Sequence, residues 1–580
     1  MTASPATPAR SALLDGIRET ANAVDVLVIG AGINGIATFR DLALNGVRVL
    51  LVDRGDFCSG ASAASSHMIH GGIRYLENGE FRLVKESVHE RNALLRLAPH
   101  YVRPLPTTIP IFSTFSSIVQ APLKFLGLRP KKRRERGALI IKAGLTIYDL
   151  FSRDGGRVPR HQFRGARASR ELLPELRDDV RWTATYYDAS MHDPERLALD
   201  VLTDGVEAGE HAHALNYVEA IDMDVDGGVS LRDVIGGETW TVHPSVVVNA
   251  SGPWTDLTNA ALGDASHYMG GTKGSHIVLD HPELLAACAG REIFFEFTDG
   301  RIVLIYPLKG RVLVGTTDLP HDMGDPIVCT EEEVDYFFGL IRHVFPAIEV
   351  DRRQIVFRFS GVRPLPRQDA DSTGQISRDY RVESRRVATT TVLSLVGGKW
   401  TTFRALGEQL SDRVLALLGR ERGVSTDGRL IGGAVGYPAT ADARLAWSER
   451  VAPGIPRDRV ETLLDRYGTS AEQILRRIES EGDAPLATAP GYSRTELLHL
   501  IETERVVRLS DIVLRRTSMA FIGEVGHATL AELAELAAAP LGWDAGRIAE
   551  EIAETAELLR EKHGVTGIEA PSPAPGRNRT

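Results

Sequence analysis

Cysteine is scarce in this sequence. The three cysteines among 580 residues, Cys58, Cys288 and Cys329, form no CxxC pair and no metal-ligand spacing. A disulfide framework is therefore not indicated, no metal site is expected, and a reducing cytoplasm is the simplest setting. Each cysteine is predicted to be a small buried apolar residue.

Long apolar runs and an excess of positive charge are also missing. No window contains about 18 uninterrupted apolar residues, so a membrane-spanning helix is not expected. The formal net charge of −10 argues against a nucleic-acid-binding protein with a basic face. Residues 1–22 are polar and lack the apolar core of a secretory signal, which predicts a flexible tail, and a second flexible tail is expected at 566–580.

The most informative stretch is DVLVIGAGINGIATFRDLALNGVRVLLVD at residues 25–53. An apolar run, a glycine-rich turn, a helix-like segment and a second apolar run that ends in an acid make one complete βαβ unit. Gly30 permits the tight turn, Gly32 lets the backbone approach a pyrophosphate, and Gly35 lets helix and strand pack closely. The helix N-terminus favours phosphates, and Asp53 can accept the adenosine ribose hydroxyls. The unit predicts a dinucleotide-binding fold, and by itself it leaves NAD and FAD open.

Small and hydroxylated residues follow this unit. The stretch RGDFCSGASAASS at 54–66 allows close approach of backbone to a flat or anionic ligand, and Ser62 and Ser66 are among its hydroxyl donors. The next stretch, HMIHGGIRYLE at 67–77, combines His, Arg and Tyr around a glycine pair. That mixture indicates a pocket wall rather than a linker.

Residues 109–151 have two interpretations. Two mostly apolar stretches, 109–128 and 138–151, flank the basic cluster KKRRER at 131–136. Such a segment suits an interfacial membrane contact, in which apolar residues enter the headgroup boundary and cations meet anionic lipid. A buried helix pair joined by a solvated basic loop fits as well, and the sequence leaves both open.

The rest of the chain predicts further domains, because 580 residues exceed what one hydrophobic core can organise. A buried strand at 242–249 returns to the nucleotide fold, and alternating apolar residues over 266–360 predict an antiparallel sheet with one solvated face. We assign 23–108, 181–265 and 360–418 to a cofactor-binding domain, 109–180 and 266–359 to a substrate-binding cap domain, and 437–565 to a C-terminal helical domain.

Taken in order, the motifs resemble those of the bacterial FAD-dependent glycerol-3-phosphate dehydrogenase family. The matching stretches are HGGIRYLE at 70–77, VVVNASGPW at 246–254, KGSHIVL at 273–279, GVRPL at 361–365, SRDY at 377–380, GGKWTTFR at 397–404 and DIVLRRT at 511–517. The resemblance covers residues 24–565. It departs from the family at His67, often a lysine in relatives, and in the more basic insertion at 131–136. It implies an α/β fold with an FAD-binding Rossmann-like domain of the glutathione-reductase and D-amino-acid-oxidase type, an antiparallel-sheet substrate domain and a helical C-terminal domain.

The resemblance also implies an activity. Family members oxidise sn-glycerol 3-phosphate to dihydroxyacetone phosphate, with hydride transfer from C2 to flavin N5, and pass the electrons to a membrane quinone. It implies that His276 takes the C2 hydroxyl proton and that Arg363 and Arg378 hold the substrate and stabilise the developing alkoxide. The implied substrate ligands are Arg74, Tyr75, His276, Arg363, Lys399 and Thr401, and the implied FAD ligands are Gly30, Gly32, Gly35, Asp53, Ser62, Ser66, Gly398 and Lys399. Noncovalent FAD and peripheral attachment to the cytoplasmic face of the plasma membrane are expected, and the oligomeric state is left open, with a homodimer as one option.

Three alternatives stay open. A peroxide-forming glycerol-3-phosphate oxidase would use nearly the same pocket. An amine or D-amino-acid oxidase shares the fold but binds a carboxylate, and the many candidate phosphate ligands count against it. A non-catalytic binding protein of this fold is disfavoured by the intact glycine fingerprint and the set of site motifs.

Overall fold

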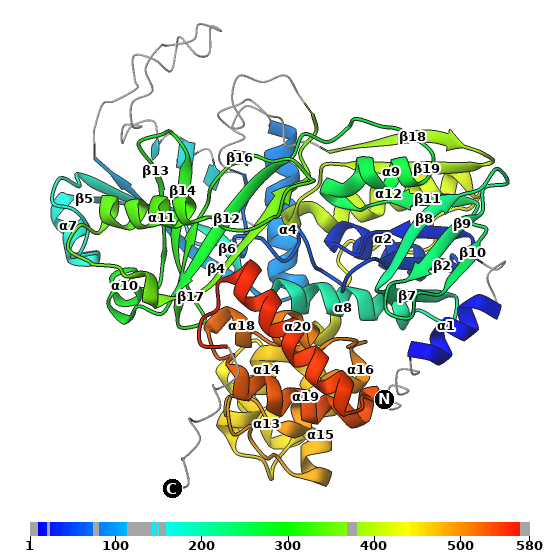
Figure 1. Cartoon of the computed structure of the whole chain (residues 1–580). Coiled ribbons are helices and arrows are strands. Elements are labelled where there is room, and N and C mark those ends of the chain that lie inside the picture. Colours follow the sequence, from blue (N-terminus) through cyan, green and yellow to red (C-terminus); the bar gives the residue numbers. More distant parts are fainter. Residues whose placement is uncertain are drawn as a thin grey trace, which may run out of the picture.

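The structure is a computed structural model that describes residues 10–19, 24–72, 81–112, 141–142, 144–146, 148–149, 158–367 and 380–568. Two large sheets lie side by side, and the C-terminal helices pack beneath them (Figure 1). The predicted α/β fold class, with a second, antiparallel sheet and a helical C-terminal domain, is confirmed.

The nucleotide-binding sheet has six strands in the order β18-β19-β11-β1-β2-β7. The strands are β1 (Val26–Ile29), β2 (Val49–Asp53), β7 (Ala212–Asn216), β11 (Val246–Asn249), β18 (Arg381–Val387) and β19 (Thr390–Val396). All neighbours run parallel except β18, which is antiparallel to β19. Because both faces of a parallel sheet are covered, β1 and β2 are almost wholly apolar.

The two faces of this sheet carry different layers. Val26 and Val28 pack into one core with helices α2 (Ile33–Leu44), α8 (Pro194–Val206) and α12 (Phe403–Leu417). Leu27 and Ile29 pack instead against a small sheet of β8 (Val218–Met223), β9 (Val229–Asp233) and β10 (Thr239–Val242). Side chains alternate between the faces of a strand, so the apolar run of β1 serves both layers.

Residues 10–19 form helix α1 (Arg10–Glu19), where the sequence predicted a flexible tail. Leu14 and Ile17 are buried in the same core as the small sheet. The Arg10 guanidinium donates to Asp233 Oδ1 at 2.7 Å. A few apolar residues within a polar stretch are too weak a pattern to reveal this docking from sequence.

The second sheet has ten strands. They are β3 (Met68–Ile69), β4 (Val102–Ile111), β5 (Gln162–Gly165), β6 (Trp182–Met191), β12 (Thr272–Leu279), β13 (Glu292–Glu296), β14 (Ile302–Leu308), β15 (Arg311–Gly315), β16 (Leu319–Pro320) and β17 (Ile355–Arg363). β4 pairs with β6 over its whole length, and β17 pairs with β12. The domain boundaries drawn from the sequence had placed most of β4, all of β6 and the end of β17 in the cofactor-binding domain. Long-range pairing brings these strands into the substrate sheet instead.

Helices α4 (Phe81–Leu97), α7 (Ala166–Leu172), α10 (Pro282–Ala287) and α11 (Glu331–Val344) accompany this sheet. Leu145 and Tyr148, from the second apolar stretch, are buried in one cluster with Leu83 and Val84 of α4. At least Leu145 and Tyr148 of that stretch therefore pack into the protein, whereas Lys142 and Thr146 are exposed. The first stretch after Phe112 and the basic cluster at 131–136 lie outside the described residues.

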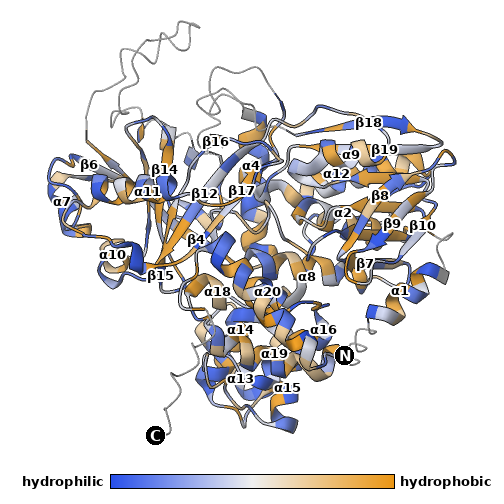
Figure 2. Cartoon of the chain, viewed as in Figure 1, coloured by the Kyte–Doolittle hydropathy of each residue, from blue (hydrophilic) through white to orange (hydrophobic). Residues whose placement is uncertain are grey.

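The C-terminal domain is built from helices. They are α13 (Ala441–Val451), α14 (Arg457–Tyr467), α15 (Ala471–Glu481), α16 (Arg494–Thr503), α17 (Leu509–Asp511), α18 (Met519–Ile522), α19 (His527–Leu541) and α20 (Ala545–His563), with a π-helical turn η9 (Ile512–Arg516). The helices show mixed apolar and polar faces, as expected for amphipathic helices around a core (Figure 2). α20 packs against β17, and η9 packs against α8. Among the described helices, none is long and apolar enough to cross a membrane.

Candidate active site

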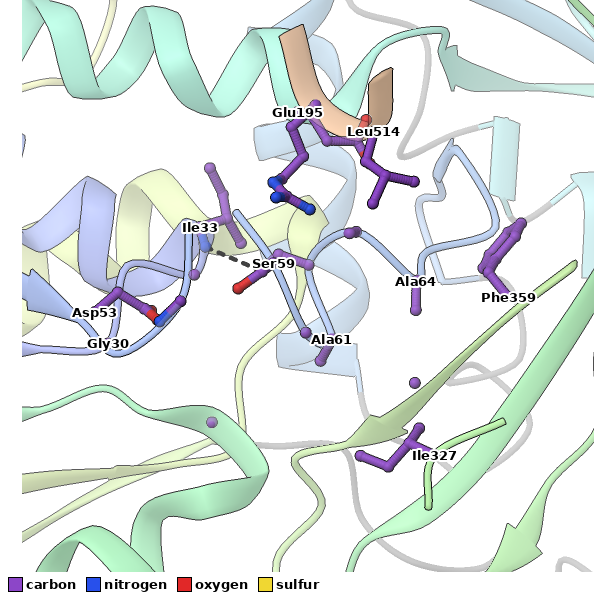
Figure 3. A pocket seen from close by; sticks show the side chains of 18 of the residues that line it. Gly30, Ile33, Asp53, Ser59, Ala61, Ala64, Glu195, Ile327, Phe359 and Leu514 are labelled. Atoms are coloured by element: carbon purple, nitrogen blue, oxygen red, sulfur yellow. Dashed lines mark hydrogen bonds between the residues drawn. The ribbon is translucent and has the colours of Figure 1, made fainter. Parts of the chain in front are cut away.

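A cavity of about 620 Å³ begins at the carboxyl ends of β1 and β2 and continues between β17 and the C-terminal helices (Figure 3). The nucleotide-binding domain contributes Gly30, Gly32, Asp53 and Ser62, the substrate sheet contributes Phe359 and Gly361, and the C-terminal domain contributes Leu514 and Arg515. Ligands of open α/β sheets bind at this edge. The volume lies within the usual range of cofactor pockets.

The glycine-rich turn has the backbone geometry that its sequence predicts. Gly30 has φ of +103°, and a Cβ there would lie 2.7 Å from the carbonyl oxygen of Ala250. A Cβ on Gly35 would lie 1.9 Å from the carbonyl oxygen of Gly30, so helix and strand could not pack this closely with a side chain. Gly32 is the N-cap of α2 and supplies no side-chain cap. The N-cap residue therefore leaves the first amides of α2 to partners from outside the helix, and Ser62 Oγ accepts one of them, that of Ile33.

The second glycine pair packs against this turn. Gly398 has φ of +109°, and a Cβ there would lie 2.5 Å from Asn34 Nδ2, at the start of α2. The Trp400 indole donates to the carbonyl oxygen of Ser62 at 3.0 Å, and Ser62 Oγ accepts from the amide of Ile33 at 3.0 Å. The loop after β2 is thus fixed between two helix starts.

His276 lies on β12, beside the loop after β2. Its Nε2 and the Ser66 Oγ are 2.8 Å apart, and its ring stacks on Phe359 with centroids 4.8 Å apart. The residue is buried. Burial, and then the positive charge of Arg363, lower the pKa of His276 well below 6.5, so the imidazole is neutral and able to accept a proton. Ser66, predicted as an FAD ligand, contacts this histidine.

Arg363 lies on β17, where alternation places it on the same face as Phe359 and Gly361. Its Nη1 donates to Asp318 Oδ1 at 2.9 Å, and its Nη2 donates to Thr316 Oγ1 at 3.0 Å. A Cβ on Gly274 would lie 2.2 Å from the guanidinium, which explains the glycine of the KGSH motif. Arg363 and His276 therefore occupy one face of two paired strands.

Lys399 and Thr401 follow the second glycine pair. Lys399 Nζ donates to Ser87 Oγ of α4 at 3.1 Å, and Thr401 Oγ1 donates to the carbonyl oxygen of His70 at 3.4 Å. The structure therefore brings 397–404 together with the start of the HGGIRYLE motif. Arg74, Tyr75 and Arg378, the other predicted substrate ligands, lie outside the described residues.

Three contact residues were missed in the sequence. Asp318 holds Arg363, Ser87 holds Lys399, and Phe359 supports His276. The run Thr316-Thr317-Asp318 directly after an apolar strand was an available signal for Asp318. Ser87 and Phe359 lie in ordinary helix and strand patterns, and only the packing reveals their contacts.

Comparison with known proteins identifies the family. The profile of the FAD dependent oxidoreductase family matches residues 25–413, and that of the C-terminal domain of alpha-glycerophosphate oxidase matches residues 388–548. The glycerol-3-phosphate dehydrogenase of Synechocystis sp. is 31% identical over 562 residues, which cover 93% of this chain and 97% of that relative. This chain belongs to the FAD-dependent glycerol-3-phosphate dehydrogenase family.

A second relative and a solved structure are also similar to this glycerol-3-phosphate dehydrogenase family member. Glycerol-3-phosphate dehydrogenase 2 of Mycobacterium tuberculosis is 31% identical over 544 residues, covering 91% of this chain and 87% of the relative. The crystal structure of the glycerol-3-phosphate dehydrogenase from Bacillus halodurans complexed with FAD has a TM-score of 0.72 at 22% identity and covers 95% of this chain and 97% of its own. That likeness extends the shared fold to all three domains.

FAD is the cofactor of this family member, and the cavity fits it. Its glycine cradle leaves no space for a Cβ at Gly30 or Gly35, and Asp53 lies where the ribose of a dinucleotide is held. Both carboxylate oxygens of Asp53 already accept backbone amides, Oδ2 from Ala31 at 2.7 Å and Oδ1 from Gly55 at 2.9 Å. Each oxygen retains a second lone pair for a ribose hydroxyl.

We expect Asp53 to make FAD binding pH-dependent. Burial raises the pKa of its carboxyl to about 6 in the cofactor-free protein, although the amides of Gly55 and Ala31 act in the opposite direction. Protonation removes acceptor capacity, so FAD affinity should fall as the pH drops through that value, by up to about tenfold for each further pH unit. Titration of the apoprotein with FAD between pH 5 and 8, followed by flavin fluorescence, measures the effect. An Asp53→Asn variant should bind FAD weakly at all these pH values. If the FAD affinity of this variant still changes with pH as in the wild type, Asp53 is not the titrating group.

Proposed function

We propose that this protein oxidises sn-glycerol 3-phosphate to dihydroxyacetone phosphate and delivers the electrons to a membrane quinone. The arrangement of His276 and Arg363 carries the proposal: a neutral buried base and a guanidinium lie on one face of β12 and β17, beside the loop that lines the FAD cavity. The glycerol-3-phosphate dehydrogenases that resemble the chain over nearly its full length support the substrate.

The proposed mechanism gives each residue one task. Bound FAD supplies the hydride acceptor. His276 Nε2 accepts the C2 hydroxyl proton once the substrate hydroxyl takes the place of Ser66 Oγ, which lies 2.8 Å from this nitrogen, and the stacked Phe359 ring holds the imidazole in place. Arg363, oriented by Asp318 and Thr316, stabilises the negative charge that develops on the C2 oxygen. Arg378 is proposed from the family motif to assist it.

The phosphate group is proposed to bind beside the second glycine pair. Thr401 contacts His70, Lys399 contacts Ser87, and the motif resemblance adds Arg74 and Tyr75. A dianion bound by several cations and hydroxyls gains about 1.5–3 kcal/mol from each charge-assisted hydrogen bond.

Lys399→Gln should therefore raise the KM for glycerol 3-phosphate by about 10- to 100-fold with a smaller change in kcat, because the phosphate contact is made in both ground and transition states. Steady-state assays with a dye acceptor would show the effect. Lys85→Gln, an exposed lysine on the same helix as Ser87, is the matched control. An unchanged KM in Lys399→Gln would remove this residue from the phosphate site.

The proposed membrane contact is peripheral. Leu145 and Tyr148 are buried, so we assign the contact to the apolar and basic residues between 113 and 140 on the basis of their sequence. Flotation with vesicles containing anionic lipid tests this assignment. Replacement of the six residues at 131–136 by alanine and glutamine should abolish flotation at low salt, and equal flotation of both proteins would contradict it.

The experiment that tests the activity is anaerobic mixing of the FAD-loaded protein with glycerol 3-phosphate. Bleaching of the flavin absorbance, followed by fast re-oxidation with a soluble quinone analogue and slow re-oxidation by air, is the expected result. Fast re-oxidation by air would favour a peroxide-forming oxidase. The absence of bleaching would overturn the proposed substrate.

A further inference from the structure

A buried cluster of four charged side chains connects the C-terminal domain to the nucleotide site. Asp56 lies in the ribose loop, which we define as residues 53–59, and is 2% exposed. Its carboxylate accepts hydrogen bonds from both Arg515 and Arg516 of η9, with Arg516 Nη2 3.0 Å from Oδ1. Asn216 Nδ2 donates to the same oxygen at 2.8 Å. The ribose loop is therefore attached to a turn that lies far away in the sequence.

The opposite side of the cluster is equally well fixed. Arg515 Nη2 donates to Asp511 Oδ1 at 2.8 Å, and Tyr217 OH donates to that oxygen at 2.5 Å. The other oxygen of Asp511 accepts the amides of Val507 and Arg508 at 3.0 and 2.9 Å. Two carboxylates and two guanidiniums thus balance each other, and their neighbours satisfy further donors and acceptors. Such a network is strongly perturbed when one member is lost, because the partner charge stays buried.

The ribose loop connects the charged cluster to the FAD site. The Gly55 amide donates to Asp53 Oδ1 at 2.9 Å, and its carbonyl oxygen accepts from the amide of Tyr217 at 2.9 Å. Asp53, Arg54, Gly55 and Ser59 line the cavity, and so do Leu514 and Arg515 themselves. Figure 3 shows that Leu514, Ser59 and Asp53 lie around the same cavity.

We propose that the C-terminal domain is part of the cofactor-binding apparatus, and that Asp56 is the positioning residue through which Arg515 and Arg516 hold the ribose loop in its FAD-binding conformation. Docking of η9 and binding of FAD are then thermodynamically coupled: each strengthens the other by the same factor. Burial raises the pKa of Asp56, but the two arginines outweigh it and hold that pKa well below its usual range, so the carboxylate stays ionised. The inference concerns FAD and is independent of the substrate.

The test compares two buried carboxylates that each accept from two arginines. Asp56→Asn should weaken FAD binding to the apoprotein at least about tenfold, a coupling of ordinary size. Glu496→Gln is the control, because Glu496 is fully buried inside the C-terminal domain and accepts from Arg459 at 2.8 Å and Arg466 at 2.9 Å without lining the cavity. FAD affinity is measured by flavin fluorescence, and the unfolding midpoints without FAD show whether each variant is folded. Equal FAD affinity in folded Asp56→Asn and wild type would overturn the proposal.

A second measurement needs no variant. Hydrogen exchange of the wild-type chain with and without FAD should show slower exchange of the amides of residues 504–517 when FAD is bound. If FAD protects the glycine turn and leaves 504–517 unchanged, the coupling does not exist. If Asp56→Asn does not fold, this result decides the question alone. Both readouts are independent of flavin reduction, so a wrong substrate assignment would not affect them.

Discussion

Replacement of His276 by alanine is expected to slow flavin reduction by glycerol 3-phosphate by about 10²- to 10⁴-fold, the usual contribution of a general base. The side chain is buried and stacked on Phe359, and its Nε2 is directed at Ser66 Oγ. The variant leaves the glycine turn and Asp53 intact, so FAD should bind as before. Anaerobic stopped-flow mixing measures the rate, and FAD content measured in the same preparation separates loss of chemistry from loss of cofactor.

The pH dependence gives an independent check on His276. Its pKa is depressed by burial and by Arg363, so the neutral base persists well below pH 6.5. We therefore expect kcat/KM of the wild type to stay constant from pH 8 to about 6 and to fall only in more acid solution.

The burial of the neutral His276 imidazole also affects stability. Below the pKa that this imidazole has in the unfolded chain, the unfolded chain binds a proton more tightly than the folded chain does, so the free energy of unfolding decreases. A wild-type reduction rate in His276→Ala would end its assignment as the base.

Replacement of Arg363 by lysine is expected to lower kcat/KM by about 10²- to 10³-fold, as for loss of one donor to a developing oxyanion. A lysine keeps the charge but cannot donate to Asp318 and Thr316 while directing further N–H groups at the substrate. Single-turnover flavin reduction across a range of glycerol 3-phosphate concentrations separates the rate from the binding of substrate.

Arg358→Lys provides the matched control for Arg363→Lys. Arg358 lies on the same strand but on the opposite face, where its Nη1 donates to Glu331 at 2.6 Å. This variant should retain nearly the full rate of flavin reduction. Equal losses in both variants would indicate a general disturbance of β17 rather than a role of Arg363 in the reaction.

Several structural features could be predicted from local sequence because they depend on local physics. The period of apolar residues and the glycine spacing at 25–53 predict strand, turn and helix, and the structure has β1, α2 and β2 at these places. The three cysteines are buried, as their isolation indicated. The C-terminal helices follow from their amphipathic pattern.

Contacts between distant segments could not be predicted in this way. The pairing of β4 with β6, the docking of α1 and the hydrogen bond between Ser66 and His276 join residues that no local pattern relates. Such contacts form only when the burial of a whole surface offsets the chain entropy lost in closing long loops.

The sequence by itself therefore determined the dinucleotide fold, the family motifs and the residue types of the candidate site. Only the tertiary structure decided which neighbours orient the individual side chains. Asp318 orients Arg363, Ser87 contacts Lys399, and the arginines of η9 hold Asp56. A motif specifies the chemical groups along the chain, whereas their orientation depends on neighbours that reach the site from other strands, helices and domains.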